Sequence, residues 1–256
     1  MTDRLDLPES LERRVSICAR RETVFRYFTD PARFARWWGE GSSIEARPGG
    51  GVLIRNPNGV VVRGEVVEIE PPRRIVFTYG YGAAGPAEQS LVTITLEENE
   101  RGTELSLHHA FSSARIRDHH VQGWRYQLAL FSKVVAEEAH AGAAERVDEF
   151  LRAWGEPDGE TRRFLLESCA TRDVVFHDAF SATAGLDEML ANLDAIQMHM
   201  PGIALVRDGD VRQSHGTALA RWSAKRENGD LVGRGTNLFD LSPDGKIARV
   251  VGFWES

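Results

Sequence analysis

The stretch TDPARFARWWG, residues 29–39, decides how the first half of this chain folds. Asp30 before Pro31 predicts a helix start, because Asp caps the free amides of a first turn and Pro fits the first helical position. The helix is expected to end at Gly39, directly after two adjacent tryptophans. Indole rings are costly to leave in water, so the pair predicts a large apolar site that receives them. Neighbours on a helix face different directions. One ring should therefore pack into the core, and the other should lie at a pocket entrance, where we expect Trp38 to contact a ligand.

The composition argues against several classes of protein. The chain has 256 residues, of which 42% are hydrophobic, and this length favours two modest domains. A formal net charge of -7 argues against surfaces for nucleic acid or for anionic membranes. No apolar run reaches the length of a spanning helix, and the N-terminal MTDRLDLPES lacks a signal-peptide core, so we expect a cytoplasmic protein. Cys18 and Cys169 are then expected to be free thiols.

Residues 10–140 are predicted to form one domain. A strand at 11–19 and two short helices precede a run of antiparallel strands, and one long helix follows at 115–140. Because a curved sheet around a long helix encloses space, this order predicts a pocket between them. The strands of the run are expected at residues 43–47, 52–55, 60–70, 74–79, 91–97 and 103–111.

Residues 143–256 are predicted to form a second domain, in which the helices come first and the sheet last. Helices are expected at 144–154, 159–168 and 186–198. Turns predicted at Gly209-Asp210, Asn228-Gly229 and Pro243-Asp244-Gly245 separate strands at 211–225, 231–241 and 246–254. The predicted fold class is α+β: a helix-grip domain, with a curved antiparallel sheet around a long C-terminal helix, followed by an α+β cone-shaped barrel. The different element order argues against an internal repeat.

The first half resembles the activator-of-Hsp90-ATPase-like branch of the START/Bet v 1 superfamily, also called SRPBCC. The resemblance covers about residues 10–138 and implies a ligand pocket between the sheet and the long helix, but no particular ligand or activity. The matching segments are residues 24–25, 29–31, 37–39, 48–50, 64–66, 71–77, 91–96, 102–105 and 123–124.

The second half is similar to SnoaL-like domains of the nuclear transport factor 2 fold. This resemblance covers about residues 143–256 and implies an apolar cone-shaped cavity, cyclase, isomerase or hydrolase chemistry in some members, and dimerisation through the sheets. The matching features are residues 150–154, Asp158, 173–178, Gly185, 201–202, Trp222 and 239–247.

Two further side chains of the first half, besides Trp38, are candidate ligand contacts. His109 shares strand parity with Leu105, Leu107 and Phe111, so it should face the cavity, where an imidazole can contact a ligand or accept a proton. The alternative is a hydrogen-bonded core histidine. Trp124 on the long helix is expected to contact the ligand, or else to serve as core scaffold.

In the second half, His177, Asp178 and Arg234 are the candidate catalytic residues. A histidine beside a carboxylate is the minimum for acid-base chemistry, but adjacent strand residues point to opposite faces, so both cannot aim inward. Asp178 alternatively begins a turn. If Trp222 faces the cavity, strand parity suggests that Arg234 does too, subject to the register across the Asn228-Gly229 turn. A buried Arg234 needs an anionic partner, Asp178 or a ligand carboxylate, whereas an exposed strand arginine is the simpler alternative.

These features predict a protein that binds a small hydrophobic or aromatic molecule, with cyclase, isomerase or hydrolase activity in the second half as an open option. Trp154 and Trp222 are expected ligand contacts there, unless their rings fill the cavity. The sequence contains no metal or cofactor motif, so we expect no metal, cofactor, nucleic acid or membrane as partner. A homodimer through the C-terminal domain is expected from the resemblance. The rival hypothesis is a protein-interaction or co-chaperone-like module with filled cavities.

Overall fold

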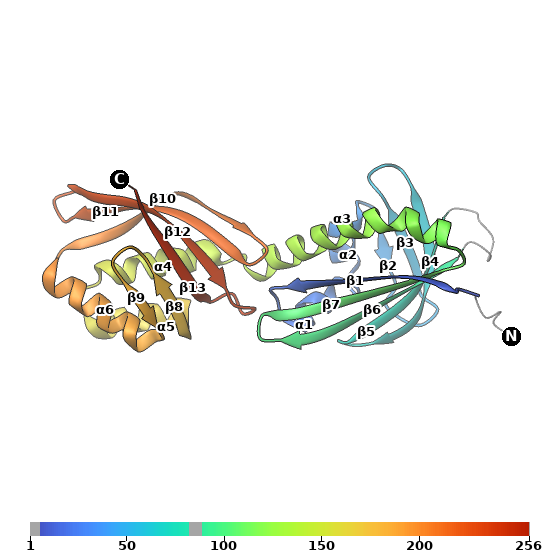
Figure 1. The fold of residues 1–256 in the computed structure, drawn as a ribbon, viewed down its shortest axis with the longest axis horizontal. Coiled ribbons are helices and arrows are strands. Elements are labelled where there is room, and N and C mark those ends of the chain that lie inside the picture. The colour runs from blue at the N-terminus through green and yellow to red at the C-terminus, as the bar shows by residue number, and fades with distance from the viewer. Residues whose placement is uncertain (1–5, 82–88, 256) are drawn as a thin grey trace. The chain divides into compact units, whose positions relative to one another are not determined.

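The computed structural model describes residues 6–81 and 89–255, and these residues have an α+β fold, as expected (Figure 1). The chain separates into two compact units, Met1–Ala136 and Glu137–Ser256, and the boundary falls in the last turn of helix α3. No helix of the described residues is long and apolar enough to cross a bilayer.

The first unit contains a seven-stranded antiparallel sheet in the order β1-β7-β6-β5-β4-β3-β2. Helix α3 lies along one face of this sheet, which is the predicted helix-grip arrangement (Figure 1). The elements of this unit are β1 (Glu9–Ile17), α1 (Arg21–Arg26), α2 (Pro31–Trp38), β2 (Ser43–Ile44), β3 (Gly51–Arg55), β4 (Val61–Glu70), β5 (Arg74–Tyr81), β6 (Ser90–Asn99), β7 (Gly102–Phe111) and α3 (Ala114–Ala139).

Helix α2 begins and ends where its sequence predicts. The Asp30 carboxylate accepts hydrogen bonds from the amides of Ala32 and Arg33, Pro31 occupies the first turn, and Gly39 follows the last helical residue. Both tryptophans of the last turn are buried, and their rings lie 4.4 Å apart. Trp37 packs edge-on against Phe131 of α3, with ring centres 4.7 Å apart. This packing holds α2 against the long helix.

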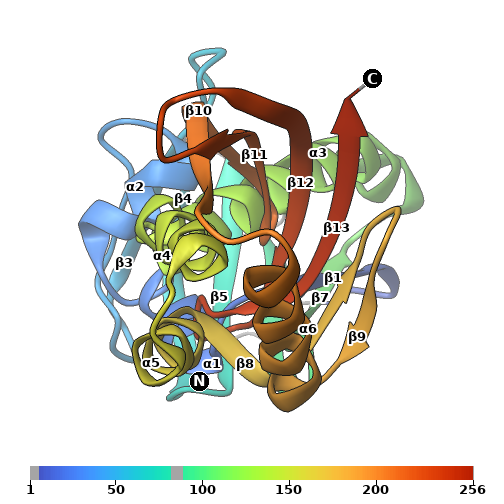
Figure 2. The same ribbon diagram turned by 90° about the vertical axis from the view of Figure 1, so that its left-hand side faces the viewer.

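The second unit contains a six-stranded sheet in the order β10-β11-β12-β13-β8-β9, in which only β13 and β8 pair in parallel among the described strands. Helices α4, α5 and α6 lie on one side of this curved sheet (Figure 2). The elements are α4 (Ala143–Gly155), α5 (Gly159–Cys169), β8 (Ala170–His177), β9 (Ala182–Ala184), α6 (Leu186–His199), β10 (Ile203–Ser214), β11 (Thr217–Arg226), β12 (Leu231–Leu241) and β13 (Ile247–Glu255).

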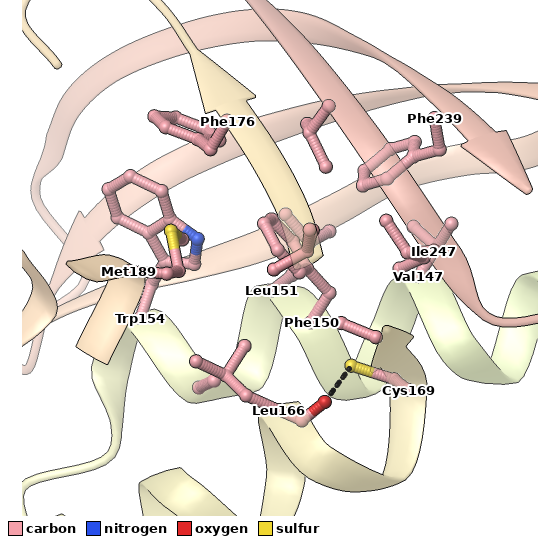
Figure 3. Close-up of a cluster of buried hydrophobic side chains, with 14 of the residues drawn as sticks. Val147, Phe150, Leu151, Trp154, Leu166, Cys169, Phe176, Met189, Phe239 and Ile247 are labelled. Atoms are coloured by element: carbon pink, nitrogen blue, oxygen red, sulfur yellow. Dashed lines mark hydrogen bonds between the residues drawn. The ribbon is translucent and has the colours of Figure 1, made fainter. Parts of the chain in front are cut away.

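Aromatic and aliphatic side chains fill the space between these helices and the sheet (Figure 3). Phe150 and Trp154 of α4 meet Phe176 of β8 and Phe239 of β12, with ring centres 5.3 to 6.4 Å apart for the three contacts between elements. The neighbouring Cys169 is buried, and desolvation raises the pKa of its thiol to about 12, so the thiol is not a nucleophile at neutral pH.

One predicted turn of the second unit is wrong. The chain does not reverse at Gly209-Asp210, because β10 continues through this pair to Ser214 with a shift of register between Asp208 and Arg212. The reversal comes at His215 and Gly216, whose φ values of 51° and 86° suit a two-residue hairpin turn. Gly209 has a positive φ that serves a bulge instead of a turn. The residues 211–225, expected to form a single strand, therefore belong to two strands, β10 and β11. The turns at Asn228-Gly229 and before Lys246 are confirmed.

The expectation that Arg234 shares a face with Trp222 is also wrong. Lys225 pairs with Leu231, but Ala224 pairs with Gly233, so Val232 is an extra residue in β12. Because a one-residue shift exchanges the two faces of a strand, Trp222 pairs with Gly235 and not with Arg234. The Trp222 ring is buried on the helix side, whereas Arg234 is exposed on the outer face.

Candidate functional site

A cleft of about 410 Å³ opens in the first unit between α3, the end of α2, strand β5 and the β3–β4 turn, residues 56–60. This volume suits a small organic ligand. Its lining is rich in aromatic rings and contains no Lys, Arg, Asp or Glu among the described residues. The lining residues are Trp38, Asn56, Pro57, Asn58, Val60, Tyr79, His119, His120, Gly123, Trp124, Tyr126 and Gln127.

Gly39 brings the end of α2 to this place. Its φ is 134°, and an added Cβ would lie 2.3 Å from the carbonyl oxygen of Arg55 in β3, so only glycine fits. The Ser42 hydroxyl then accepts a hydrogen bond from the Arg55 amide at 2.9 Å. These two close approaches place Trp38 and the β3–β4 turn in the wall of one cleft.

The face of α3 toward the cleft carries four residues at helical spacing: His120, Gly123, Trp124 and Gln127. A Cβ added to Gly123 would meet no heavy atom within 4 Å, so this position borders open space. Sequence reasoning singled out Trp124 alone on this face. The i, i+3, i+4 and i+7 spacing around it was the signal that could have identified the others.

His109 lies behind Trp124 in a chain of hydrogen bonds. The indole Nε1 of Trp124 donates to His109 Nδ1 at 2.9 Å, and an indole nitrogen cannot accept, so Nδ1 carries no proton. The proton is therefore on Nε2, which donates to the Ser90 hydroxyl at 2.7 Å, and Ser90 donates to the Tyr79 carbonyl oxygen at 2.8 Å.

The environment keeps His109 neutral. The ring is fully buried, and desolvation, with smaller contributions from His120 and His108, holds its pKa well below the usual value. Both ring nitrogens are engaged, and the ring is not part of the cleft lining. The geometry corresponds to the hydrogen-bonded core histidine among the alternatives, and its contribution to the cleft is to hold Trp124.

His120 is the ionisable group that the sequence analysis did not select for this cleft. Its Nδ1 lies 2.8 Å from the Ile116 carbonyl oxygen, and its ring packs against Phe111 and Tyr79. Desolvation lowers its pKa below the usual value. Burial of this ring therefore favours an uncharged imidazole in the cleft wall.

In the second unit the three candidate catalytic residues do not form one cluster, although Asp178 and Trp222 both contact Trp254 and Arg234 lines the same surface pocket as Trp222. His177 is exposed at the end of β8. The Asp178 carboxylate accepts hydrogen bonds from the amides of Phe180 and Ser181 at 2.8 and 2.7 Å. These bonds begin a turn, which is the alternative to a catalytic role given for Asp178 from the sequence. Its second oxygen accepts from Trp254 Nε1 at 3.1 Å. Arg234 lies on the outer face of the sheet, so it does not form the buried pair with Asp178 that the sequence suggested.

The two candidate tryptophans of the second unit pack inside it. Trp154 belongs to the hydrophobic core (Figure 3), and its buried indole nitrogen has no hydrogen-bond partner among the described residues. Trp222 donates to the Asn237 side-chain oxygen at 2.8 Å and packs edge-on against Trp254, 4.9 Å away. Among the residues that the structure describes, no group of three His, Cys, Asp or Glu side chains is arranged to hold a metal ion.

Comparison with known proteins identifies the first unit. Residues 18–136 match the family model described as Activator of Hsp90 ATPase homolog 1-like protein. The resemblance expected for the first half of the chain is therefore confirmed. No curated protein matches the chain.

Several solved structures are similar to about half of the chain. A candidate isomerase of the SnoaL-like family from Agrobacterium tumefaciens is 27% identical with a TM-score of 0.42, over 46% of this chain and 99% of that one. A protein from Mesorhizobium loti is 21% identical with a TM-score of 0.46, over 51% and 98%. CalU16 from Micromonospora echinospora is 28% identical with a TM-score of 0.39, over 48% and 74%. These similarities name no ligand for this chain.

Proposed function

Residues 18–136 form a domain of the Activator of Hsp90 ATPase homolog 1-like family, and we propose that this domain binds a small, uncharged aromatic molecule in its cleft. The observation that carries the proposal is Gly123. Glycine inside a helix costs about 1 kcal/mol relative to alanine. Gly123 is exposed, and outside its chain neighbours and its own helix backbone no atom lies within 4 Å of the Cβ that alanine would add, so packing against other elements does not require glycine here. The missing side chain leaves room in the cleft.

The chemistry of the lining supports this class of ligand. The Tyr126 ring is 68% exposed in this lining, and the largely buried rings of Trp38, Tyr79 and Trp124 border the same space, which favours flat apolar rings. The described lining lacks a charged lysine, arginine or carboxylate that could pair with a ligand charge. Because an ionic ligand would lose hydration without gaining a partner, a neutral molecule is favoured.

The test is a titration of the full chain with a two-ring aromatic alcohol, 2-naphthol, followed by calorimetry and by tryptophan fluorescence. The wild type should bind, the Gly123→Leu variant should lose at least about tenfold in affinity because its side chain occupies the cleft, and Gly123→Ala should retain binding. Equal binding by the wild type and a folded Gly123→Leu variant would place the ligand elsewhere. Absence of binding by the wild type to a panel of such neutral aromatic compounds would remove the proposal.

Cyclase, isomerase or hydrolase activity in the second domain, residues 143–256, receives less support from its geometry. Trp154 and Phe176 fill part of the interior, His177 and Arg234 are exposed, and the half-buried Asp178 is engaged by turn amides and by Trp254. We propose instead that this domain pairs two copies of the chain.

The outer face of its sheet supports that role. Val206, Leu231 and Phe253 are large apolar residues exposed on this face. Charges of both signs surround them, with Asp208 opposite Arg221 and Glu255 opposite Arg234 in the strand register. Such a face can be self-complementary about a twofold axis. Sedimentation equilibrium should give a dimer that Phe253→Glu dissociates, and a monomeric wild type would contradict this role.

A further inference from the structure

The Gln127 side chain is fixed in the wall of the cleft by a helix end. Its Nε2 donates to the carbonyl oxygen of Trp37, in the last turn of α2. The last carbonyls of a helix have no partner within the helix, so this contact satisfies one of them. Since a carbonyl oxygen can only accept, the amide nitrogen must face Trp37, and this fixes the orientation of the whole amide.

The same contact leaves Oε1 of Gln127 as an acceptor. No described residue donates a hydrogen bond to this oxygen, and the oxygen is not sealed from solvent. The Gln127 residue is only 8% exposed, and it lines the cleft. The accessible Oε1 therefore faces the cleft.

Three neighbouring polar groups already have partners inside the protein, whereas the buried Nε1 of Trp38 has no hydrogen-bond partner among the described residues. Trp124 Nε1 donates to His109, Asn56 Nδ2 donates to the Val60 carbonyl oxygen, and Asn58 Oδ1 accepts from the Val60 amide. Two further groups, His119 and Tyr126, lie at exposed positions of the lining. Gln127 Oε1 is thus an acceptor with a fixed direction in the nearly buried wall.

We propose that the ligand of the cleft carries a hydrogen-bond donor, a phenolic hydroxyl or a ring N–H, which it donates to Gln127 Oε1. This inference rests on the proposed function and assigns Gln127 as its specificity-determining residue. A site whose fixed acceptor is desolvated by the ligand rejects an analogue of the same shape that lacks the donor, because the acceptor then loses its water without replacement.

The test compares two ligands that differ in one methyl group, 2-naphthol and 2-methoxynaphthalene, in calorimetric titrations of the full chain. The wild type should bind 2-naphthol at least about tenfold more tightly, which is the usual scale of one buried hydrogen bond. Gln127→Met has a similar shape without the amide, and it should reduce the ratio of the two affinities to about one. Gln122→Met is the matched control, because Gln122 is exposed on the same helix and does not line the cleft. This control should keep the wild-type ratio.

The possible failures are distinguishable. If neither compound binds the wild type, the proposed function fails; if both bind equally well, the cleft binds aromatics but the donor inference is wrong. A preference that persists in Gln127→Met also overturns the assignment. Should Gln127→Met not fold, the side-chain amide resonance of Gln127 in the wild type decides. It should shift with 2-naphthol and much less with the methyl ether, and equal shifts would overturn the inference.

Discussion

Both domains contain a buried tryptophan whose indole nitrogen donates to a polar side chain and which has a glycine beside it, yet the two domains use the space differently. In the first, Trp124 donates to His109, and the adjacent Gly123 borders open space. In the second, Trp222 donates to Asn237, and an added Cβ at Gly235 would lie 2.4 Å from the Trp222 ring. One glycine leaves a cleft open, and the other accommodates the indole itself. A tryptophan–glycine association therefore does not indicate a pocket unless the neighbouring side chains leave the space empty.

A substitution that creates a cavity in the core of the second domain should have the largest effect on stability. Phe176→Ala removes a ring that packs against Trp154 and Phe150 and is 1% exposed. The expected loss is about 3–5 kcal/mol of unfolding free energy, measured by urea denaturation. The variant should also be stabilised by benzene, since an apolar cavity binds apolar ligands.

The control for that variant is Phe164→Ala, because the Phe164 side chain is 69% exposed on α5. Its unfolding free energy should stay within about 0.5 kcal/mol of the wild type. If Phe176→Ala were equally harmless, the second core would be loosely packed and the contrast between the domains would disappear.

The sequence predicts the elements of both domains better than it predicts which residues meet. The cap at Asp30, the helix ending before Gly39 and the turn at Asn228-Gly229 depend on local chemistry, so they could be recognised. The face occupied by Arg234 could not, because it depends on the single extra residue Val232, which local sequence does not mark as a bulge. Without this extra residue, the pairing of Lys225 with Leu231 would continue to a pairing of Trp222 with Arg234, and Arg234 would face the interior.

The candidate site shows the same limit. Trp38 and Trp124 were expected in the first cavity and line the cleft. Gln127 was not selected, because its importance comes from the Trp37 carbonyl oxygen, 90 residues away in sequence. Contacts of this kind depend on how α2 and α3 meet, and no residue pattern within either helix specifies that.

Removing the imidazole behind the cleft should have the next largest effect. His109→Leu leaves the buried Nε1 of Trp124 without its acceptor, and a lost partner of this kind costs about 1–3 kcal/mol. Urea denaturation should show this loss, and the affinity for 2-naphthol should fall because Trp124 is no longer held. His108→Leu on the exposed face of the same strand is the control and should change neither quantity. A wild-type stability for His109→Leu would mean that the hydrogen-bond chain is dispensable.

Between about pH 7 and pH 5, the pH dependence of stability should arise mainly from two histidines of the first domain. Burial lowers the pKa of His109 and His120 in the folded chain, whereas an unfolded histidine titrates near pH 6.5. Below that pH the unfolded chain binds more protons, so unfolding free energy should fall as the pH is lowered from about 7 to 5. Urea denaturation across this range should show a shallower fall for His109→Leu. An unchanged slope would mean that His109 does not contribute to the loss.

The smallest expected effects compare one substitution at two glycines. Gly123→Ala should raise the unfolding free energy by about 0.5–1 kcal/mol, because alanine favours the helix and its methyl group meets no neighbour within 4 Å. Gly155→Ala at the end of α4 should lower it by about 1 kcal/mol, because the added Cβ would lie 2.8 Å from the Cβ of Ala204. Thermal denaturation of the two variants side by side should give shifts of opposite sign. Shifts of the same sign would show that the space beside Gly123 is no more open than the close contact between Gly155 and Ala204, and the cleft would then lose its main support.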